Sequence, residues 1–231
     1  MNTDQIKKNI DAIQEKITEA CEKCGRSADE VTLMAVTKTK PRGLADAAYE
    51  AGIRIFGENR VQEAEEKYST FFREGELHLI GHLQSNKAKN AANLFSWVQS
   101  IDKLKTARAL AKYCGEAGKI MNILLEINTS GEESKFGYAD PEAAYRDLDE
   151  ILGLEHLRLR GLMTIGPLTP DKAEIRQAFR SLKQQFDSLK KRYPDETVDT
   201  LSMGMSSDYE IAIEEGATMV RLGTTIFGAR G

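Results

Sequence analysis

The chain has 231 residues, 41% of them hydrophobic, and a formal net charge of -4. This length suits one large α/β domain or two small domains, and the weakly negative charge argues against a protein whose main role is to hold nucleic acid. No apolar run approaches the roughly 18 residues that a membrane helix requires, and the N-terminus lacks the apolar stretch of a signal peptide. We therefore expect a cytoplasmic protein with no membrane or nucleic-acid partner.

The first segment, residues 3–24, has the apolar periodicity of one amphipathic helix, which Gly25 ends. Cys21 and Cys24 form a C-x-x-C pair, which is also compatible with redox or metal chemistry. Both cysteines continue the apolar stripe of the helix, and no second pair of cysteine or histidine residues stands at ligand spacing. We therefore assign them to core packing and expect no metal site.

Eight short apolar runs follow, and segments with helical periodicity separate them. The runs span residues 31–36, 54–57, 77–81, 95–101, 120–127, 157–165, 198–203 and 217–223. Eight strand signals alternating with helices indicate parallel pairing, because each return to the same end of a sheet needs a crossover. An open doubly wound sheet is the alternative. The count of eight and the chain length favour a closed (β/α)8 barrel of the TIM type.

The whole chain, residues 1–231, is interpreted as a single α/β domain. The eighth run ends at residue 223, shortly before the last residue, so we expect no eighth helix after it. The N-terminal helix, residues 1–25, would then pack on the barrel and cover the gap that this missing helix leaves.

Active sites of such barrels form at the C-terminal ends of the strands, and two cations there are informative. Lys38 follows the first apolar run, and strand alternation places it on the same face as Met34 and Val36. Arg221 lies inside the eighth run, where burial of a cation is costly without a partner. Because the first and eighth strands are neighbours in a closed barrel, both cations approach its mouth. They predict an anionic ligand, or carboxylates from elsewhere in the chain.

The loops after strands seven and eight of these barrels often bind phosphate, and here they read SMGMSSD (202–208) and RLGTT (221–225). A glycine in each loop allows close approach of the backbone, and the serines and threonines offer hydroxyl donors. Capping of the helix that begins near Asp208, by Ser206 or Ser207, is the competing interpretation. A phosphate site opposite a desolvated lysine is the layout that pyridoxal 5'-phosphate (PLP) requires, because the lysine forms an imine while the loops hold the phosphate.

Six motifs resemble those of the PLP homeostasis protein family, whose members are small PLP-binding proteins related to the barrel domain of alanine racemase. In chain order they are AVTKTKP (35–41), FGENRVQE (56–63), HLIGHLQSNK (78–87), RGLMTI (160–165), LSMGMSSD (201–208) and MVRLGTTIFGAR (219–230). The match runs from about residue 31 to the C-terminus. The resemblance implies a fold-type III PLP-binding barrel that acts as a PLP carrier or buffer in intracellular vitamin B6 homeostasis.

The resemblance also implies how the cofactor ring is bound. Lys38 matches the lysine that forms the Schiff base, Asn59 the asparagine near the ring, and Arg221 the arginine that faces the pyridine nitrogen. Arginine stays protonated and can only donate, so the ring nitrogen stays unprotonated and PLP is a weaker electron sink than it is with an aspartate partner. His82 occupies a position that is not fixed among relatives and receives no role.

For the phosphate, the resemblance implies Ser206 and the Gly223–Thr224 pair. Ser207 is included with them, although it stands where relatives vary. Lys135 resembles a family lysine that helps to exchange the cofactor, and a solvated loop lysine is the alternative interpretation.

Three functions compete. A PLP-dependent amino-acid racemase would resemble alanine racemases, whose second, β-rich domain supplies a tyrosine as second base; no such domain follows the eighth strand here, and only Tyr138 and Tyr209 lie in nearby loops. A metal-dependent hydrolase needs clustered histidines and carboxylates, of which only His82 is well placed. We therefore favour a monomeric PLP carrier without catalytic activity, which meets PLP-dependent apoenzymes only transiently.

Overall fold

Eight parallel strands form one closed barrel in which the first strand pairs with both the second and the eighth. The computed structural model describes residues 2–68, 70, 72, 74–132 and 136–229. The closed barrel predicted from the eight apolar runs is therefore confirmed, and the open sheet is excluded. The strands are β1 (Thr32–Val36), β2 (Ile55–Glu58), β3 (Glu76–Leu79), β4 (Trp97–Ile101), β5 (Met121–Glu126), β6 (Leu157–Met163), β7 (Thr200–Ser202) and β8 (Met219–Leu222).

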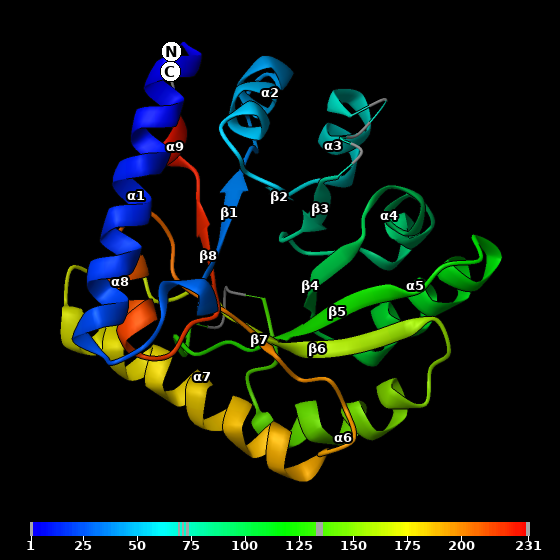
Figure 1. Cartoon of the computed structure of the whole chain (residues 1–231). Helices are drawn as coiled ribbons and strands as arrows, with labels where there is room; N and C mark the ends of the chain where they lie inside the picture. Colours follow the sequence, from blue (N-terminus) through cyan, green and yellow to red (C-terminus); the bar gives the residue numbers. More distant parts are fainter. Residues whose placement is uncertain (1, 69, 71, 73, 133–135, 230–231) are drawn as a thin grey trace.

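Helices surround the barrel and cover its outer surface (Figure 1). Within the described ranges, none of them is long and apolar enough to cross a bilayer. The expectation that no helix follows the eighth strand is wrong, because a short helix of four residues comes directly after β8. The helices are α1 (Thr3–Lys23), α2 (Arg42–Glu50), α3 (Val61–Lys67), α4 (Ala88–Leu94), α5 (Leu104–Glu116), α6 (Pro141–Leu152), α7 (Lys172–Arg192), α8 (Tyr209–Glu214) and α9 (Thr224–Phe227).

Helix α1 packs against α2, α8 and α9 (Figure 1). The side chain of Asn2 caps its first turn by accepting a hydrogen bond from the backbone of Gln5. Asn9 donates a hydrogen bond of 2.9 Å to the carbonyl oxygen of Ile226 in α9. Cys21 is buried on the apolar stripe, whereas Cys24 is only half-buried at the helix end, and both thiols are free.

Side chains of the first strand alternate between two environments. Leu33 and Ala35 belong to the large core between strands and helices, whereas Met34 and Val36 point into the barrel. Extension of this alternation places the residue after Thr37 on the inner side. Two small apolar clusters fill the barrel interior beside polar residues: Met34, Val36, Ile80 and Met219 form one, and Trp97, Leu124 and Met163 form the other.

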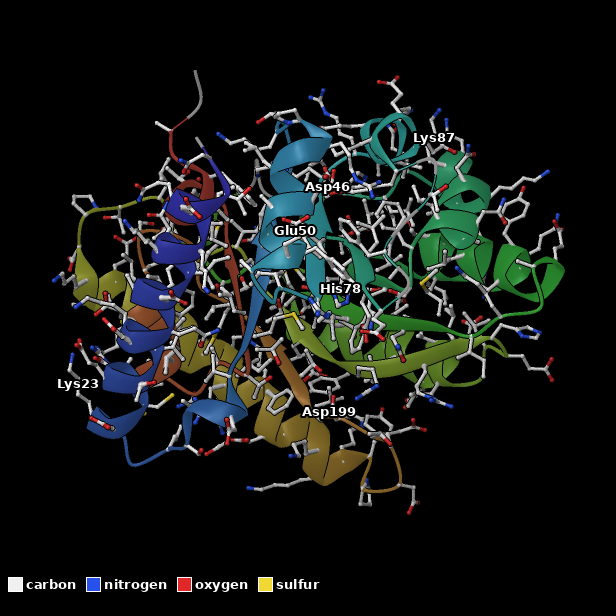
Figure 2. All side chains as sticks on the ribbon, turned by 45° about the horizontal axis from the view of Figure 1, so that its top comes forward. Lys23, Asp46, Glu50, His78, Lys87 and Asp199 are labelled. Atoms are coloured by element: carbon white, nitrogen blue, oxygen red, sulfur yellow. The ribbon has the colours of Figure 1, made fainter. Side chains whose placement is uncertain are left out.

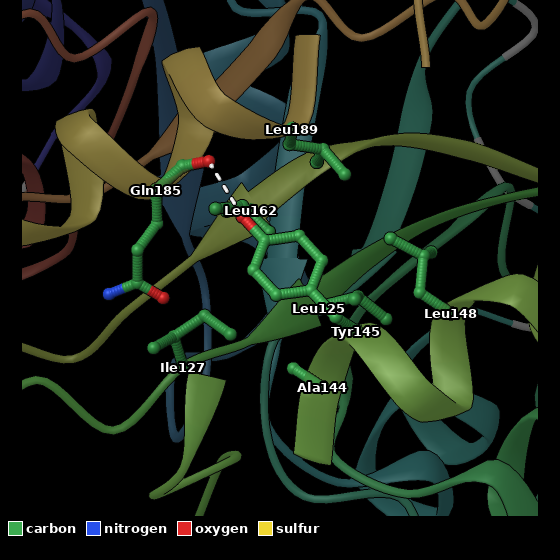
Figure 3. A pocket seen from close by; sticks show the side chains of 8 residues that line it. All are labelled: Leu125, Ile127, Ala144, Tyr145, Leu148, Leu162, Gln185 and Leu189. Atoms are coloured by element: carbon green, nitrogen blue, oxygen red, sulfur yellow. Dashed lines mark hydrogen bonds between the residues drawn. The ribbon is translucent and has the colours of Figure 1, made fainter. Parts of the chain in front are cut away.

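Helices α6 and α7 pack over β5 and β6 with almost no free space (Figure 3). The cavity between them is only about 10 Å³, and leucine and isoleucine side chains provide most of its lining. Tyr145 of α6 bridges the two helices by donating a hydrogen bond of 3.5 Å to the carbonyl oxygen of Gln185. A space of this size holds one water molecule at most, so it is a packing defect and no ligand site.

Candidate site at the C-terminal mouth of the barrel

Lys38 lies in a tight turn directly after β1 and is half-buried. Thr39, the next residue, adopts a left-handed backbone with φ of 60°, which non-glycine residues rarely do. The backbone amide of Thr39 donates to the carboxylate of Glu63 in α3, and the amide of Thr37 donates to the carbonyl oxygen of Gly57 in β2. Backbone contacts on both sides therefore hold the turn that carries Lys38.

A buried ion pair supports this turn from below. Lys67, in α3, donates to the carbonyl oxygen of Thr37 at 2.6 Å and to Oε1 of Glu58 at 2.7 Å. The hydroxyl of Thr37 lies 2.7 Å from the same Oε1 and 2.8 Å from the hydroxyl of Tyr68. The Glu58 side chain is fully buried, and burial raises the pKa of its carboxyl in spite of Lys67. The backbone next to Lys38 is thus fixed by a network that the sequence did not predict.

Lys40 connects the same turn to the far end of the chain. Its Nζ donates to the carbonyl oxygens of Gly228 and Ala229, both at 3.1 Å. These are carbonyl groups at and beyond the end of α9, where a cation interacts favourably with the free carbonyls.

The predicted phosphate-binding residues converge from two loops. The backbone amide of Thr225 donates a hydrogen bond of 3.3 Å to Oγ of Ser206, so the loop after β7 contacts the first turn of α9. Ser206 is half-buried, and Ser207 and Thr224 are exposed. Gly223 joins β8 to α9, and a Cβ there would come 3.2 Å from the carbonyl oxygen of Val36. The SMGMSSD and RLGTT segments are therefore neighbours in the structure.

Neither serine caps α8, which corrects the competing interpretation of the SMGMSSD loop. The N-cap residue of α8 is Asp208, and its Oδ1 accepts a hydrogen bond of 2.6 Å from the backbone amide of Met205. The carboxylate turns back into its own loop instead of binding the helix amides. Ser206 consequently keeps its hydroxyl toward α9.

Arg221 points into the barrel and is 4% exposed. Its two terminal nitrogens donate to Oγ of Ser202 at 2.6 Å and to the carbonyl oxygen of Thr164 at 2.7 Å. Burial lowers the pKa of the guanidinium to about 10, although the charges of Glu126 and Asp208 oppose this shift. Arg221 therefore remains a cation at neutral pH, and the carboxylates expected near it come from β5 and from the loop after β7.

A directed chain of hydrogen bonds runs from Arg221 through the barrel. Ser202 accepts from Arg221 and donates to Oε1 of Gln99 at 2.7 Å, and Nε2 of Gln99 lies 2.9 Å from Nδ1 of His78. Nε2 of His78 lies 3.2 Å from the carboxylate of Glu76, at the opposite end of the barrel. Burial lowers the pKa of His78, so it is neutral, with its proton on Nε2. Figure 2 shows His78 near the barrel centre.

This chain ends at a hollow on the N-terminal face of the barrel. The hollow has a volume of about 320 Å³, and Glu76, Trp97, Arg160 and Asp199 contribute to its lining. Arg160 pairs with Asp199 and lies over the Trp97 ring at 5.2 Å from its centroid. The charged side chains of this hollow are thus largely satisfied by one another.

Asn59 lies in a bend after β2 and is half-buried. The backbone of Gly81, after β3, touches the backbone of Asn59 so closely that a Cβ at Gly81 would collide with it. The hydroxyl of Ser100 in β4 donates to the carbonyl oxygen of Gly81 at 2.7 Å. The ends of β2, β3 and β4 are therefore held together next to Asn59.

The ends of β3, β4 and β5 carry one histidine and two acids. Nδ1 of His82 lies 3.1 Å from Oδ2 of Asp102, and Glu126 is the last residue of β5. Burial raises the pKa of Glu126 to about 7, repulsion from Asp102 adds to the shift and attraction by Arg221 opposes it. Lys135 lies outside the described residues. Within the described residues, no cluster of three or more potential ligands fits a metal ion.

Several residues of this network were not predicted from the sequence, although the sequence contains a signal for two of them. Gln99 and Ser202 are polar residues inside apolar runs, and such an exception points to an internal hydrogen-bond network. Lys67 sits on a short helix among exposed charges and gives no such signal.

The chain with this closed barrel and polar mouth matches a known protein family. The model of the alanine racemase N-terminal domain family matches residues 2–231, and the chain belongs to this family. Within it, the chain belongs to the PLP homeostasis proteins. It is 45% identical over 228 residues to the pyridoxal phosphate homeostasis protein of Haemophilus influenzae, covering 97% of this chain and 96% of the relative. The corresponding Escherichia coli K12 protein is 44% identical over 235 residues, covering 97% of each chain.

Solved structures with the same fold are also similar to this chain. A protein of unknown function from Bifidobacterium adolescentis superimposes with a TM-score of 0.90 at 36% identity, covering 97% of this chain and 95% of the other. PipY of Synechococcus elongatus, solved with PLP bound, gives 0.80 at 38% identity, covering 86% of this chain and 93% of PipY. An alanine racemase from Clostridium difficile gives 0.75 at 14% identity, covering 98% of this chain and 57% of the enzyme, and shows the shared fold alone.

Proposed function

We propose that this protein binds PLP as an imine on Nζ of Lys38 and acts as a carrier or buffer of the cofactor in intracellular vitamin B6 homeostasis. The observation that carries the proposal is the convergence of Lys38, the Ser206 loop and Arg221 at one barrel mouth, in a chain 38% identical to a protein solved with PLP bound. Cytoplasmic location and a monomeric state belong to the same proposal.

The polar groups at this mouth fit PLP. Ser206, Ser207, Gly223 and Thr224 would hold the phosphate, since both loops offer hydroxyls and backbone amides next to a glycine whose Cβ position is crowded by β1. Arg221 would donate to the ring nitrogen, and Asn59, after β2, would lie beside the ring.

When bound, PLP supplies an aldehyde that condenses with primary amines and a ring that withdraws electrons. Arg221 limits the second property. A buried guanidinium that stays charged only donates hydrogen bonds and cannot accept one from a protonated ring nitrogen, so it favours the unprotonated nitrogen. This favours holding the cofactor over chemistry that needs a strongly stabilised carbanion.

The two tyrosines that the sequence placed in nearby loops support a carrier over a racemase. The hydroxyl of Tyr138 donates to Asp147 in α6 at 2.8 Å and so is engaged outside the barrel. Tyr209 is buried in the first turn of α8 and not in a loop, which corrects the position expected for it. Burial raises the pKa of both hydroxyls, so neither suits the role of a second base at neutral pH.

A carrier also needs recipients. PLP-dependent apoenzymes, met transiently, are the partners that we propose. Lys38 at the rim of the barrel is half-buried, which is compatible with exchange of a bound cofactor.

The test is an absorbance spectrum of the purified protein with and without PLP, beside the Lys38→Ala variant and the Lys89→Ala variant as a matched control on α4. We expect an imine band that borohydride traps at Lys38, and that only the Lys38 variant lacks. An unchanged band in Lys38→Ala would overturn the binding mode. Turnover of L-alanine by the wild type at roughly 1 per second or more would replace the carrier by an enzyme.

A further inference from the structure

Two acidic side chains at the barrel mouth bury oxygen atoms that lack a hydrogen-bond partner. Glu126 is 3% exposed, and among the described residues its Oε2 finds no hydrogen-bond donor. The side chain of Asp102 is 7% exposed, and its Oδ1 also finds none there. Buried carboxylate oxygens are normally paired, because an unpaired one has lost its hydration without gaining a hydrogen bond in return. Two such atoms at the ends of neighbouring strands point to a missing donor.

The nearby cations do not supply this donor. Arg221 donates to Ser202 and Thr164, and within the described residues it forms no ion pair with Glu126. Lys103 comes only within 3.7 Å of Asp102, and its side chain is 52% exposed. Within the described residues, the charge of Asp102 is therefore only partly balanced, by His82 and Lys103, and Glu126 has no ion-pair partner.

Aromatic rings complete the surroundings. The ring of His82 stacks on Phe136 at a centroid distance of 3.9 Å and an interplanar angle of 10°. Phe136 is 54% exposed, which is unusual for a side chain of this size. Aromatic faces beside carboxylates are the surroundings that attract organic cations.

We propose that Asp102 and Glu126 form a binding site for the ammonium group of a small primary amine. An ammonium group donates three hydrogen bonds and carries the charge that the two unpartnered oxygens need. The pair disfavours ligands with a carboxylate of their own, because a further anion next to two acids is repelled. Monoamines and diamines are therefore favoured over amino acids.

The site has a role that rests on the proposed function. A carrier releases PLP when another amine replaces Lys38. The incoming ammonium group transfers one proton to the carboxylate of Glu126, and its nitrogen then adds to the carbon of the protonated imine. One of its two remaining protons passes to Nζ of Lys38, which leaves as a neutral amine when its bond to that carbon breaks, and the other proton stays on the nitrogen of the new protonated imine, so atoms and charges balance. A site for amines at the same barrel mouth thus serves release of the cofactor.

The first experiment uses the apoprotein and needs no cofactor. Methylammonium is titrated into the wild type, Glu126→Gln, Asp102→Asn and the control Glu116→Gln, which lies on the outer face of α5, and binding is followed by calorimetry or by NMR. We expect the wild type and the control to bind methylammonium, and both site variants to bind it with an affinity lower by about tenfold or more. Glycine should bind more weakly than methylammonium. Equal affinity in all four proteins would overturn the site.

The second experiment uses the PLP-loaded protein. Release of PLP by methylamine should be about tenfold slower in Glu126→Gln than in the wild type, whereas release by hydroxylamine, which is neutral at pH 7.5, should be equal in both. Equal release by methylamine would overturn the role in exchange. A wild type that forms no imine would instead refute the proposed function, while the apoprotein titration still decides on the amine site.

Discussion

The ammonium group of Lys40 donates to the carbonyl oxygen of Gly228, which lies 188 residues further along the chain, at a distance of 3.1 Å. Lys40 comes two residues after Lys38, and Gly228 ends the helix that starts at Thr224. The turn that carries Lys38 and the helix next to the loops proposed to bind phosphate are thus connected by one side chain. The two halves of the proposed cofactor site are held in a fixed relation.

Replacement of Lys40 by methionine should weaken PLP binding without abolishing the imine. The variant loses the hydrogen bonds to Gly228 and Ala229, so we expect an affinity lower by about tenfold, which corresponds to about 1.4 kcal/mol. Titration with PLP, followed by the imine absorbance, measures this. Lys89→Met on α4 is the control, and equal affinity in both variants would contradict the link.

Replacement of Lys67 by methionine should destabilise the protein strongly. The carboxyl of Glu58 would stay buried without its cation, and removal of one partner of a buried pair costs about 3–5 kcal/mol. Urea unfolding measures the loss. The double variant Lys67→Met, Glu58→Gln should recover part of the lost stability, because no charge is then buried. A double variant less stable than Lys67→Met alone would argue against the ion pair as the cause.

Glu126 should make the stability of the protein depend on pH. Its pKa is raised from 4.5 to about 7 in the folded state, so the folded protein binds this proton more tightly than the unfolded chain. Below pH 4.5 Glu126 is protonated in both the folded and the unfolded state, so it adds nothing to the pH dependence of the free energy of unfolding. As the pH rises to about 7 only the unfolded chain loses the proton, and the free energy of unfolding falls by about 1.4 kcal/mol per pH unit.

The Glu126→Gln variant isolates this effect. Between pH 5 and pH 8 its free energy of unfolding should gain about 2–3 kcal/mol relative to the wild type, as measured by urea unfolding at each pH. Glu116→Gln, at an exposed position on α5, should follow the wild type throughout. A constant difference between Glu126→Gln and the wild type at every pH would show that the carboxyl titrates at its ordinary pKa.

Gly161 should tolerate no side chain. It lies in β6 with φ of 149°, and a Cβ there would overlap the carbonyl oxygen of Thr200 in β7. We expect Gly161→Ala to lower the free energy of unfolding by at least about 3 kcal/mol. Gly43→Ala in α2, where nothing lies within 4 Å of the new Cβ, should change stability by less than about 1 kcal/mol, and to the stabilising side. Equal effects would contradict the steric explanation.

The sequence predicted the barrel well because each strand is buried on both faces and therefore reads as an apolar run. It placed strand ends less well. Phe95, predicted at the start of the fourth strand, ends α4 instead, since a buried residue looks the same at a helix end and in a strand. Arg221 was predicted to need partners, but Glu126 and Asp208 lie 95 and 13 residues away and no local pattern connects them.

The hydrogen bond between Asn9 and Ile226 spans 217 residues, and it has a consequence for biosynthesis. At a translation rate of about 5–20 residues per second, α1 leaves the ribosome about 10–40 seconds before the residues of α9 exist. During that interval its stripe of isoleucines lacks the cover that α8 and α9 provide, and long-range contacts of this kind form late. Helix α1 is therefore synthesised long before its cover is complete, and part of its apolar face stays open to other contacts in the nascent chain.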